Sequence, residues 1–100
     1  MAQVTIEFVG WLAEQIGPGR DSPVILRETV GEGQTLADLL ATLVARYPSL
    51  VDIVFDPSDQ RVHDQVAVIL NGRVYQAVGG LGAALHDGDR LVLLPGFAGG

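Results

Sequence analysis

RLVLLPGFAGG, residues 90–100, says more about this chain than any other stretch of its sequence. Residues 90–94 are apolar after the initial arginine, and a strand that is apolar on both faces is predicted to lie in the middle of a sheet. The proline that follows stiffens the exit from this strand, and residues 95–100 are predicted to form an extended tail. The final pair, Gly99-Gly100, is the least hindered backbone that a chain can offer to the groups of another protein.

A β-hairpin is predicted upstream of this strand. It consists of residues 66–70, the turn Asn71-Gly72 and a second strand at residues 73–75. Asn-Gly supplies both of the positive-φ positions that a type I′ turn requires, so the hairpin signal is strong. Residues 79–82 are rich in glycine, but they lack the spacing and the lysine of a phosphate-binding loop, so a tight loop is predicted there.

A helix is predicted from about residue 36 to residue 46. Thr35 is a good N-cap, and Asp38, three residues later, completes a capping-box pattern with Asp in place of Glu. Pro48 ends the helix, because the residue before a proline avoids the helical region. Apolar residues recur at helical spacing and form one stripe that is predicted to anchor the core: Leu36, Leu39, Leu40, Leu43, Val44 and Tyr47.

The first third of the chain is predicted to contribute two strands. Residues 4–8 alternate between apolar and polar, and residues 23–30 are apolar and rich in β-branched side chains, so they form a hairpin with a long connection. Residues 11–16 are predicted to add a short helical turn. The acidic stretch at residues 49–64 is predicted to be an irregular, solvated loop with one helical turn.

The order of strand, strand, helix, hairpin and final strand predicts an α+β roll. The whole chain, residues 1–100, is expected to form one domain, with residues 95–100 as its tail.

Composition excludes several classes of function. The chain has 100 residues, of which 48% are hydrophobic, and no cysteine for a disulfide, a thiolate metal site or a nucleophile. The formal net charge of −6, with arginine as every basic residue, argues against nucleic acid and favours a basic protein surface as partner. The two histidines, His63 and His86, lie far apart, so no metal site is predicted. The sequence shows neither a nucleophile–base pair nor a pair of acid–base carboxylates, either of which would indicate an enzyme.

The sequence also argues against a membrane protein. No apolar run approaches the length that is needed to span a bilayer. The first residues lack the basic and apolar regions of a signal peptide, so a cytoplasmic location is the expectation.

Three segments resemble the ThiS/MoaD family of ubiquitin-like β-grasp sulfur carriers. Residues 85–100, LHDGDRLVLLPGFAGG, are similar to the family signature of Asp-Gly-Asp, an apolar strand, proline, an apolar residue, a small residue and Gly-Gly. VILNG, residues 68–72, resembles the V-x-V-N-G hairpin of the family, and FVGWLAEQIG, residues 8–17, is a weaker match. The resemblance implies a β-grasp (ubiquitin-like) roll, a mixed sheet of about four to five strands with one main crossover helix.

The departures from the family pattern concern the pathway rather than the carrier role. Gly96 stands where many molybdopterin-synthase small subunits have a second proline, and Ala13 replaces a basic residue that is common after the first strand. Residues 79–81 and the long segment before the third strand are closer to longer members, including carriers used for cysteine biosynthesis.

In such proteins the C-terminal carboxylate, here on Gly100, is adenylated by a ubiquitin-activating-type enzyme that uses ATP and magnesium. Sulfur then replaces the adenylate, and the resulting thiocarboxylate enters a sulfur-accepting synthase. The resemblance therefore implies a carrier that binds no cofactor or metal and has no catalytic residues of its own. It assigns the contacts with the partners to the tail, in which Phe97 either anchors a partner channel or packs on its own domain: Pro95, Gly96, Phe97, Ala98 and Gly99.

Four functional hypotheses are compatible with these residues. The first is a MoaD-like small subunit of molybdopterin synthase in molybdopterin biosynthesis, and the second is a carrier of sulfur for cysteine or another thiolated metabolite or RNA. The third is a noncovalent ubiquitin-like interaction domain in which Gly-Gly is incidental. The fourth is conjugation of the tail to lysines of other proteins.

Overall fold

The computed structural model describes residues 1–17, 19 and 23–96. Within these residues, five strands form one mixed sheet in the order β2-β1-β7-β5-β6, and two short strands pair separately as β3-β4. The strands are β1 (Ala2–Phe8), β2 (Val24–Val30), β3 (Phe55–Asp56), β4 (Arg61–Val62), β5 (Val66–Leu70), β6 (Arg73–Val74) and β7 (Arg90–Pro95). The helices are α1 (Leu12–Ile16) and α2 (Leu36–Arg46), with 3-10 turns at η1 (Pro48–Val51), η2 (Tyr75–Val78) and η3 (Gly80–Gly82). The α+β fold, the mixed sheet and the single main helix are therefore confirmed.

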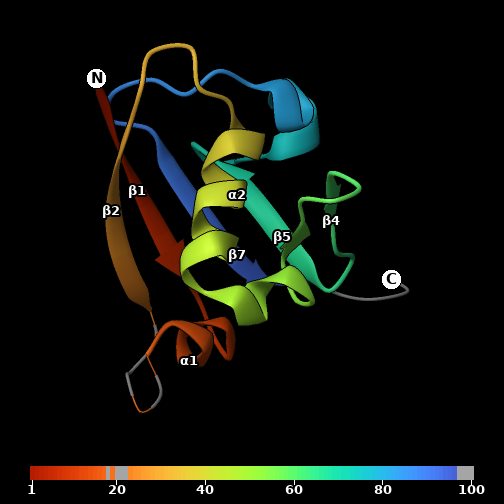
Figure 1. Ribbon diagram of the computed structural model, residues 1–100. Helices are drawn as coiled ribbons and strands as arrows, with labels where there is room; N and C mark the ends of the chain where they lie inside the picture. The colour runs from red at the N-terminus through yellow and green to blue at the C-terminus, as the bar shows by residue number, and fades with distance from the viewer. Residues whose placement is uncertain (18, 20–22, 97–100) are drawn as a thin grey trace.

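The last strand is the central strand of the sheet, as predicted. β7 runs parallel to β1 and antiparallel to β5, so Leu93 lies opposite Phe8 on one side and Val68 on the other. A parallel pair needs a crossover connection, and α2 provides it by lying across one face of the sheet (Figure 1). Asn71 and Gly72 have φ angles of 52° and 84°, which confirms the positive-φ turn between β5 and β6.

α2 begins and ends at the predicted residues. The Thr35 backbone N–H donates to Asp38 at 2.9 Å, and the Asp38 N–H donates to Thr35 Oγ1 at 3.3 Å, so both halves of the capping box are present. The apolar stripe of α2 faces the sheet and is buried at Leu36, Leu39, Leu40, Leu43 and Val44, whereas Tyr47 is partly buried. Near its other end, Arg46 pairs with Glu28 of β2, which raises the pKa of the guanidinium mainly through their hydrogen bond.

Residues 49–64 are more ordered than predicted. The segment forms η1 and then the β3–β4 hairpin, in which Phe55 lies opposite Val62. Phe55 is completely buried and Val54 is 1% exposed, so the hairpin is held by its contact with the core. The acidic side chains do face solvent as predicted. Asp56 accepts hydrogen bonds from Ser58, which lower the pKa of its carboxyl.

Along the part of the chain that the structure describes, none of the helices combines the length and the apolar character that crossing a membrane requires.

Candidate functional site

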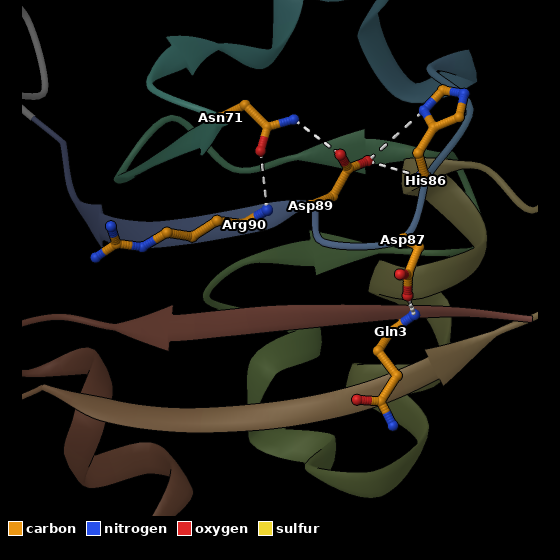
Figure 2. A network of polar contacts seen from close by, with 6 residues as sticks. All are labelled: Gln3, Asn71, His86, Asp87, Asp89 and Arg90. Atoms are coloured by element: carbon orange, nitrogen blue, oxygen red, sulfur yellow. Dashed lines mark hydrogen bonds and ion pairs between the residues drawn. The ribbon is translucent and has the colours of Figure 1, made fainter.

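A network of polar contacts holds the start of β7 (Figure 2). The two carboxylate oxygens of Asp89 accept hydrogen bonds from the Asn71 side chain at 2.9 Å and from the His86 backbone N–H at 2.7 Å. Asn71 in turn accepts from the Arg90 backbone N–H at 2.9 Å. The turn of the β5–β6 hairpin is thereby joined to the first residue of β7.

Asp87, the first aspartate of the Asp-Gly-Asp motif, connects the start of β7 to its other neighbouring strand, β1. Asp87 accepts a hydrogen bond from the Gln3 backbone N–H at 2.8 Å, and the Gly88 N–H donates to the Gln3 carbonyl at the same distance. The two aspartates of the Asp-Gly-Asp motif therefore connect β7 to β1 and to the β5–β6 hairpin. Since a slip of one residue would turn every side chain of β7 to the opposite face, this network helps to set which residues leave the sheet as the tail.

Replacing Asp89 with asparagine is expected to lower the free energy of unfolding by about 1–3 kcal/mol. Asparagine has the same shape, but one of the two donors that now meet a carboxylate oxygen would meet an NH₂ group instead. Urea denaturation measures the loss. Asp59→Asn, at an exposed position between β3 and β4, is the control, and an equal effect of both substitutions would show that the network adds no stability.

The face of the sheet that lies opposite α2 carries an apolar patch. Ala67 lies opposite Leu94, and Ile69 lies opposite both Val92 and Val74. We call these five residues the outer stripe. Val74 is 50% exposed and the other four are half-buried, whereas their neighbours along β5 and β7 point into the core. An ion pair between Glu7 and Arg90, 2.7 Å long, borders the stripe on the β1 side.

The outer stripe corrects one expectation. β7 was predicted to be central because it is apolar on both faces, and it is central, but only one of its faces is buried. Leu91 and Leu93 lie in the core, whereas Val92 and Leu94 lie on the outer stripe. The apolar character of the outer face is therefore available to a partner.

The first two residues of the predicted tail are held by the domain. Pro95 is the last residue of β7 and lies opposite Val66, so the strand is one residue longer than predicted. The Gly96 backbone N–H donates to the Gln65 carbonyl at 2.8 Å. Because the ladder alternates, the nitrogen of Pro95 points away from β5, and its missing N–H removes no hydrogen bond from that pairing.

A pocket of about 280 Å³ lies beside Gly96. Its walls come from β4 and the segment after it, from β5, and from the start of η2. Apolar and polar groups both line it, including Val62, His63, Val66, Val74 and Tyr75. The outer stripe and this pocket together border the point at which the tail leaves the domain.

In the structure, Pro95 and Gly96 lie beside two surfaces that were not predicted from the sequence, the outer stripe and the pocket. The other predicted site residues, Phe97, Ala98, Gly99 and Gly100, lie outside the described residues. The missed surfaces had a partial signal in the sequence, since the outer positions of β5 and β7 are apolar where a solvated face would be polar. Among the described residues, no three acidic or histidine side chains come close enough together to hold a metal ion.

Comparison with known proteins identifies the family. The family model described as the ThiS family matches residues 6–100. The chain is 34% identical over 86 residues to a protein of Mycobacterium tuberculosis named sulfur carrier protein CysO, covering 78% of this chain and 92% of the relative.

Two solved structures support the same relationship. The crystal structure of small archaeal modifier protein 1 from Haloferax volcanii superimposes with a TM-score of 0.75 at 30% identity, covering 97% of this chain and all of the other. The Amycolatopsis orientalis BexX/CysO complex contains a chain that superimposes with a TM-score of 0.71 at 26% identity, covering 97% of this chain and 99% of the other.

The family match over almost the whole sequence agrees with the ubiquitin-like β-grasp fold and with the motifs at the start and end of β7. The chain belongs to the ThiS family of ubiquitin-like sulfur carriers.

Proposed function

We propose that this protein carries sulfur as a thiocarboxylate on Gly100 and delivers it to a second enzyme. The observation that carries the proposal is the position of Pro95 and Gly96. Pro95 and Gly96 leave the central strand beside an open apolar face, and the sequence Phe97-Ala98-Gly99-Gly100 follows directly. The match to a relative that is named a sulfur carrier over 92% of its length supports the same role.

The chemistry that we propose explains the two glycines. A carboxylate is a poor electrophile, so a partner enzyme first transfers AMP from ATP to Gly100, with magnesium, and pyrophosphate leaves. Sulfide (HS⁻) then attacks the acyl carbon. The new C–S bond forms as the C–O bond to AMP breaks, and AMP leaves with that electron pair, so the thiocarboxylate forms without any change of oxidation state. Glycine places no side chain beside the attacked carbon, and Gly99 lets the backbone approach the wall of the partner closely.

The outer stripe is the surface that we expect the activating enzyme to cover. An exposed apolar patch rimmed by polar residues marks an interaction site, and this one continues directly into the tail through Leu94 and Pro95. The net charge of −6 favours a basic rim on the partner. A homologous chain has been crystallised in the BexX/CysO complex, which supports a stable complex with a protein partner.

Two acceptor pathways follow from different observations. The Asp-Gly-Asp, strand, proline and Gly-Gly signature is compatible with a MoaD-like role as the small subunit of molybdopterin synthase, although Gly96 replaces the second proline of many such subunits. The match to CysO at 34% identity supports a carrier of sulfur for cysteine. Incubating the thiocarboxylated protein with each candidate synthase, and measuring which one returns Gly100 to the carboxylate, would distinguish the two pathways.

The carrier role is tested by measuring the intact mass of the protein after incubation with a ThiS-type activating enzyme, ATP, magnesium and a sulfur donor. We expect the mass increase of one oxygen-for-sulfur exchange, located at Gly100 by fragmentation. Omitting ATP is the control and should abolish the change. An unchanged mass with several cognate activating enzymes would favour a noncovalent interaction domain, and protein adducts of higher mass would indicate conjugation.

A further inference from the structure

Gly96 is held in a backbone cradle that leaves little room for a side chain. Its N–H donates to the Gln65 carbonyl, and a Cβ atom on Gly96 would lie 3.2 Å from the Asp64 carbonyl oxygen. The same Cβ would lie 3.4 Å from the carbonyl carbon of Val66 and 3.5 Å from the nitrogen of Ala67. All three neighbours are backbone atoms, so none of them can rotate away as the end of a side chain can.

The cradle is itself anchored to the core. The Gln65 side chain donates to the carbonyls of Asp52 and Ile53 at 3.3 and 3.2 Å. His63 donates from its backbone to Val54 at 2.8 Å, and its Nε2 lies 2.7 Å from a carbonyl oxygen in η1. The segment that Gly96 contacts is therefore held by hydrogen bonds to η1 and to residues 52–54, which lie between η1 and β3.

A second glycine contacts the tail from the opposite direction. Gly10, which follows β1 and has a φ of 66°, approaches Pro95 so closely that an added Cβ would lie 3.2 Å from Pro95 Cγ. The Val9 N–H donates to the Leu93 carbonyl at 3.0 Å just before this contact. Pro95 and Gly96 thus lie closely packed between the β1–α1 connection and the segment at residues 64–67. We call this arrangement the tail clamp.

We propose that Gly96 is a positioning residue of the carrier. By fitting the cradle, it fixes the point and the direction from which residues 97–100 start, and it thereby determines where the Gly100 carboxylate lies in a partner that has docked on the domain. This inference rests on the proposed thiocarboxylate function and deepens it. It assigns a role in the reaction to a glycine outside the terminal pair.

The length of the tail makes this starting point important. Four residues can span at most about 14 Å when fully extended, so any shift of the starting point must be absorbed within this short length. A misplacement of about 1 Å can reduce the rate of an enzymatic reaction by about 100-fold, because the reacting atoms lose their aligned contact. A side chain on residue 96 would require a shift of the start of the tail or of the backbone at residues 64–67.

Gly96→Val tests the proposal, with Gly96→Ala as a milder variant and Gly82→Val as the matched control. Gly82 is exposed, and a Cβ there meets no atom within 4 Å. The measurement is the steady-state rate of thiocarboxylate formation at several carrier concentrations, combined with the Tm of each variant. We expect the kcat of G96V to fall about tenfold or more at a nearly unchanged KM. We expect a smaller fall for G96A and none for G82V.

The separate effects on kcat and on KM distinguish a positioning role of Gly96 from a loss of stability. Partial unfolding removes active carrier, which raises the apparent KM and leaves kcat unchanged, so that pattern would overturn the proposal. Equal kcat values for G96V, G82V and the unmodified protein would overturn it as well. Failure of the unmodified protein to accept sulfur would instead refute the proposed function. If G96V does not fold, the comparison between G96A and Gly82→Ala decides.

Hydrogen exchange gives a second readout that needs no enzyme. The Gly96 amide of the unmodified protein is expected to exchange slowly, because it donates to Gln65, and the amide of residue 96 in G96V is expected to exchange faster. Rapid exchange of Gly96 in the unmodified protein would show that the clamp is not formed in solution and would overturn the proposal.

Discussion

A chain that lacks Gly99 and Gly100 is expected to acquire no sulfur at all and to keep the stability of the full-length protein. The reason is that the proposed acyl carbon would move to Ala98, two residues closer to the clamp, and about 7 Å of reach would be lost. The described core ends before the deleted residues, with Leu93 as its last buried side chain. Intact mass after incubation with the activating enzyme, ATP and a sulfur donor measures the first effect, and Tm measures the second.

The matched control changes one of the two deleted positions without shortening the chain. Gly99→Ala keeps the length and adds one methyl group, so we expect slower but measurable sulfur acquisition. If the shortened chain still supports sulfur transfer in a complete reaction, the terminal glycines are incidental and the protein acts as a noncovalent interaction domain. A shortened chain that unfolds would also contradict the separation of tail and core.

Two adjacent leucines of β7 are expected to differ in which property suffers most when each is replaced by alanine, stability for Leu93 and partner binding for Leu94. Leu93 has no exposed surface and lies between Phe8 and Val68 in the register of the central strand. Leu93→Ala therefore leaves a cavity and is expected to lower the free energy of unfolding by about 2–5 kcal/mol. Leu94 is half-buried on the outer stripe, so Leu94→Ala is expected to cost about 1 kcal/mol.

For binding to the activating enzyme, the larger effect is expected from Leu94→Ala and not from Leu93→Ala. Leu94→Ala removes apolar surface from the proposed docking face, so the KM for the activating enzyme is expected to rise about tenfold. Leu93→Ala should leave the KM of the folded fraction nearly unchanged, because its side chain points into the core. Chemical denaturation and titration of the carrier in the activation assay measure the two effects. An unchanged KM for L94A would show that the activating enzyme does not use this part of the outer stripe.

Local patterns were sufficient for the regular elements. The bounds of α2 follow from the capping residues Thr35 and Asp38 and from Pro48, which act within a few positions of themselves. The β5–β6 turn follows from Asn71-Gly72 in the same way. The family could also be identified from the sequence, because its motifs are short and contiguous at both ends of β7. The β3–β4 hairpin was missed because its two-residue strands are too short to show a period, and Phe55 orders it through contact with the core.

Local sequence patterns predict α2, the five strands of the main sheet, the central position of β7 and the glycine pair that we propose carries the chemistry. The identity of the open apolar face of β7 and the starting point of the tail follow only from how the folded chain packs. The open face depends on the side of the sheet that α2 covers, and the tail clamp depends on Gly10 and residues 64–67, which lie far from Gly96 in the sequence. Such contacts depend on the register between distant strands, which no local period or turn signal encodes.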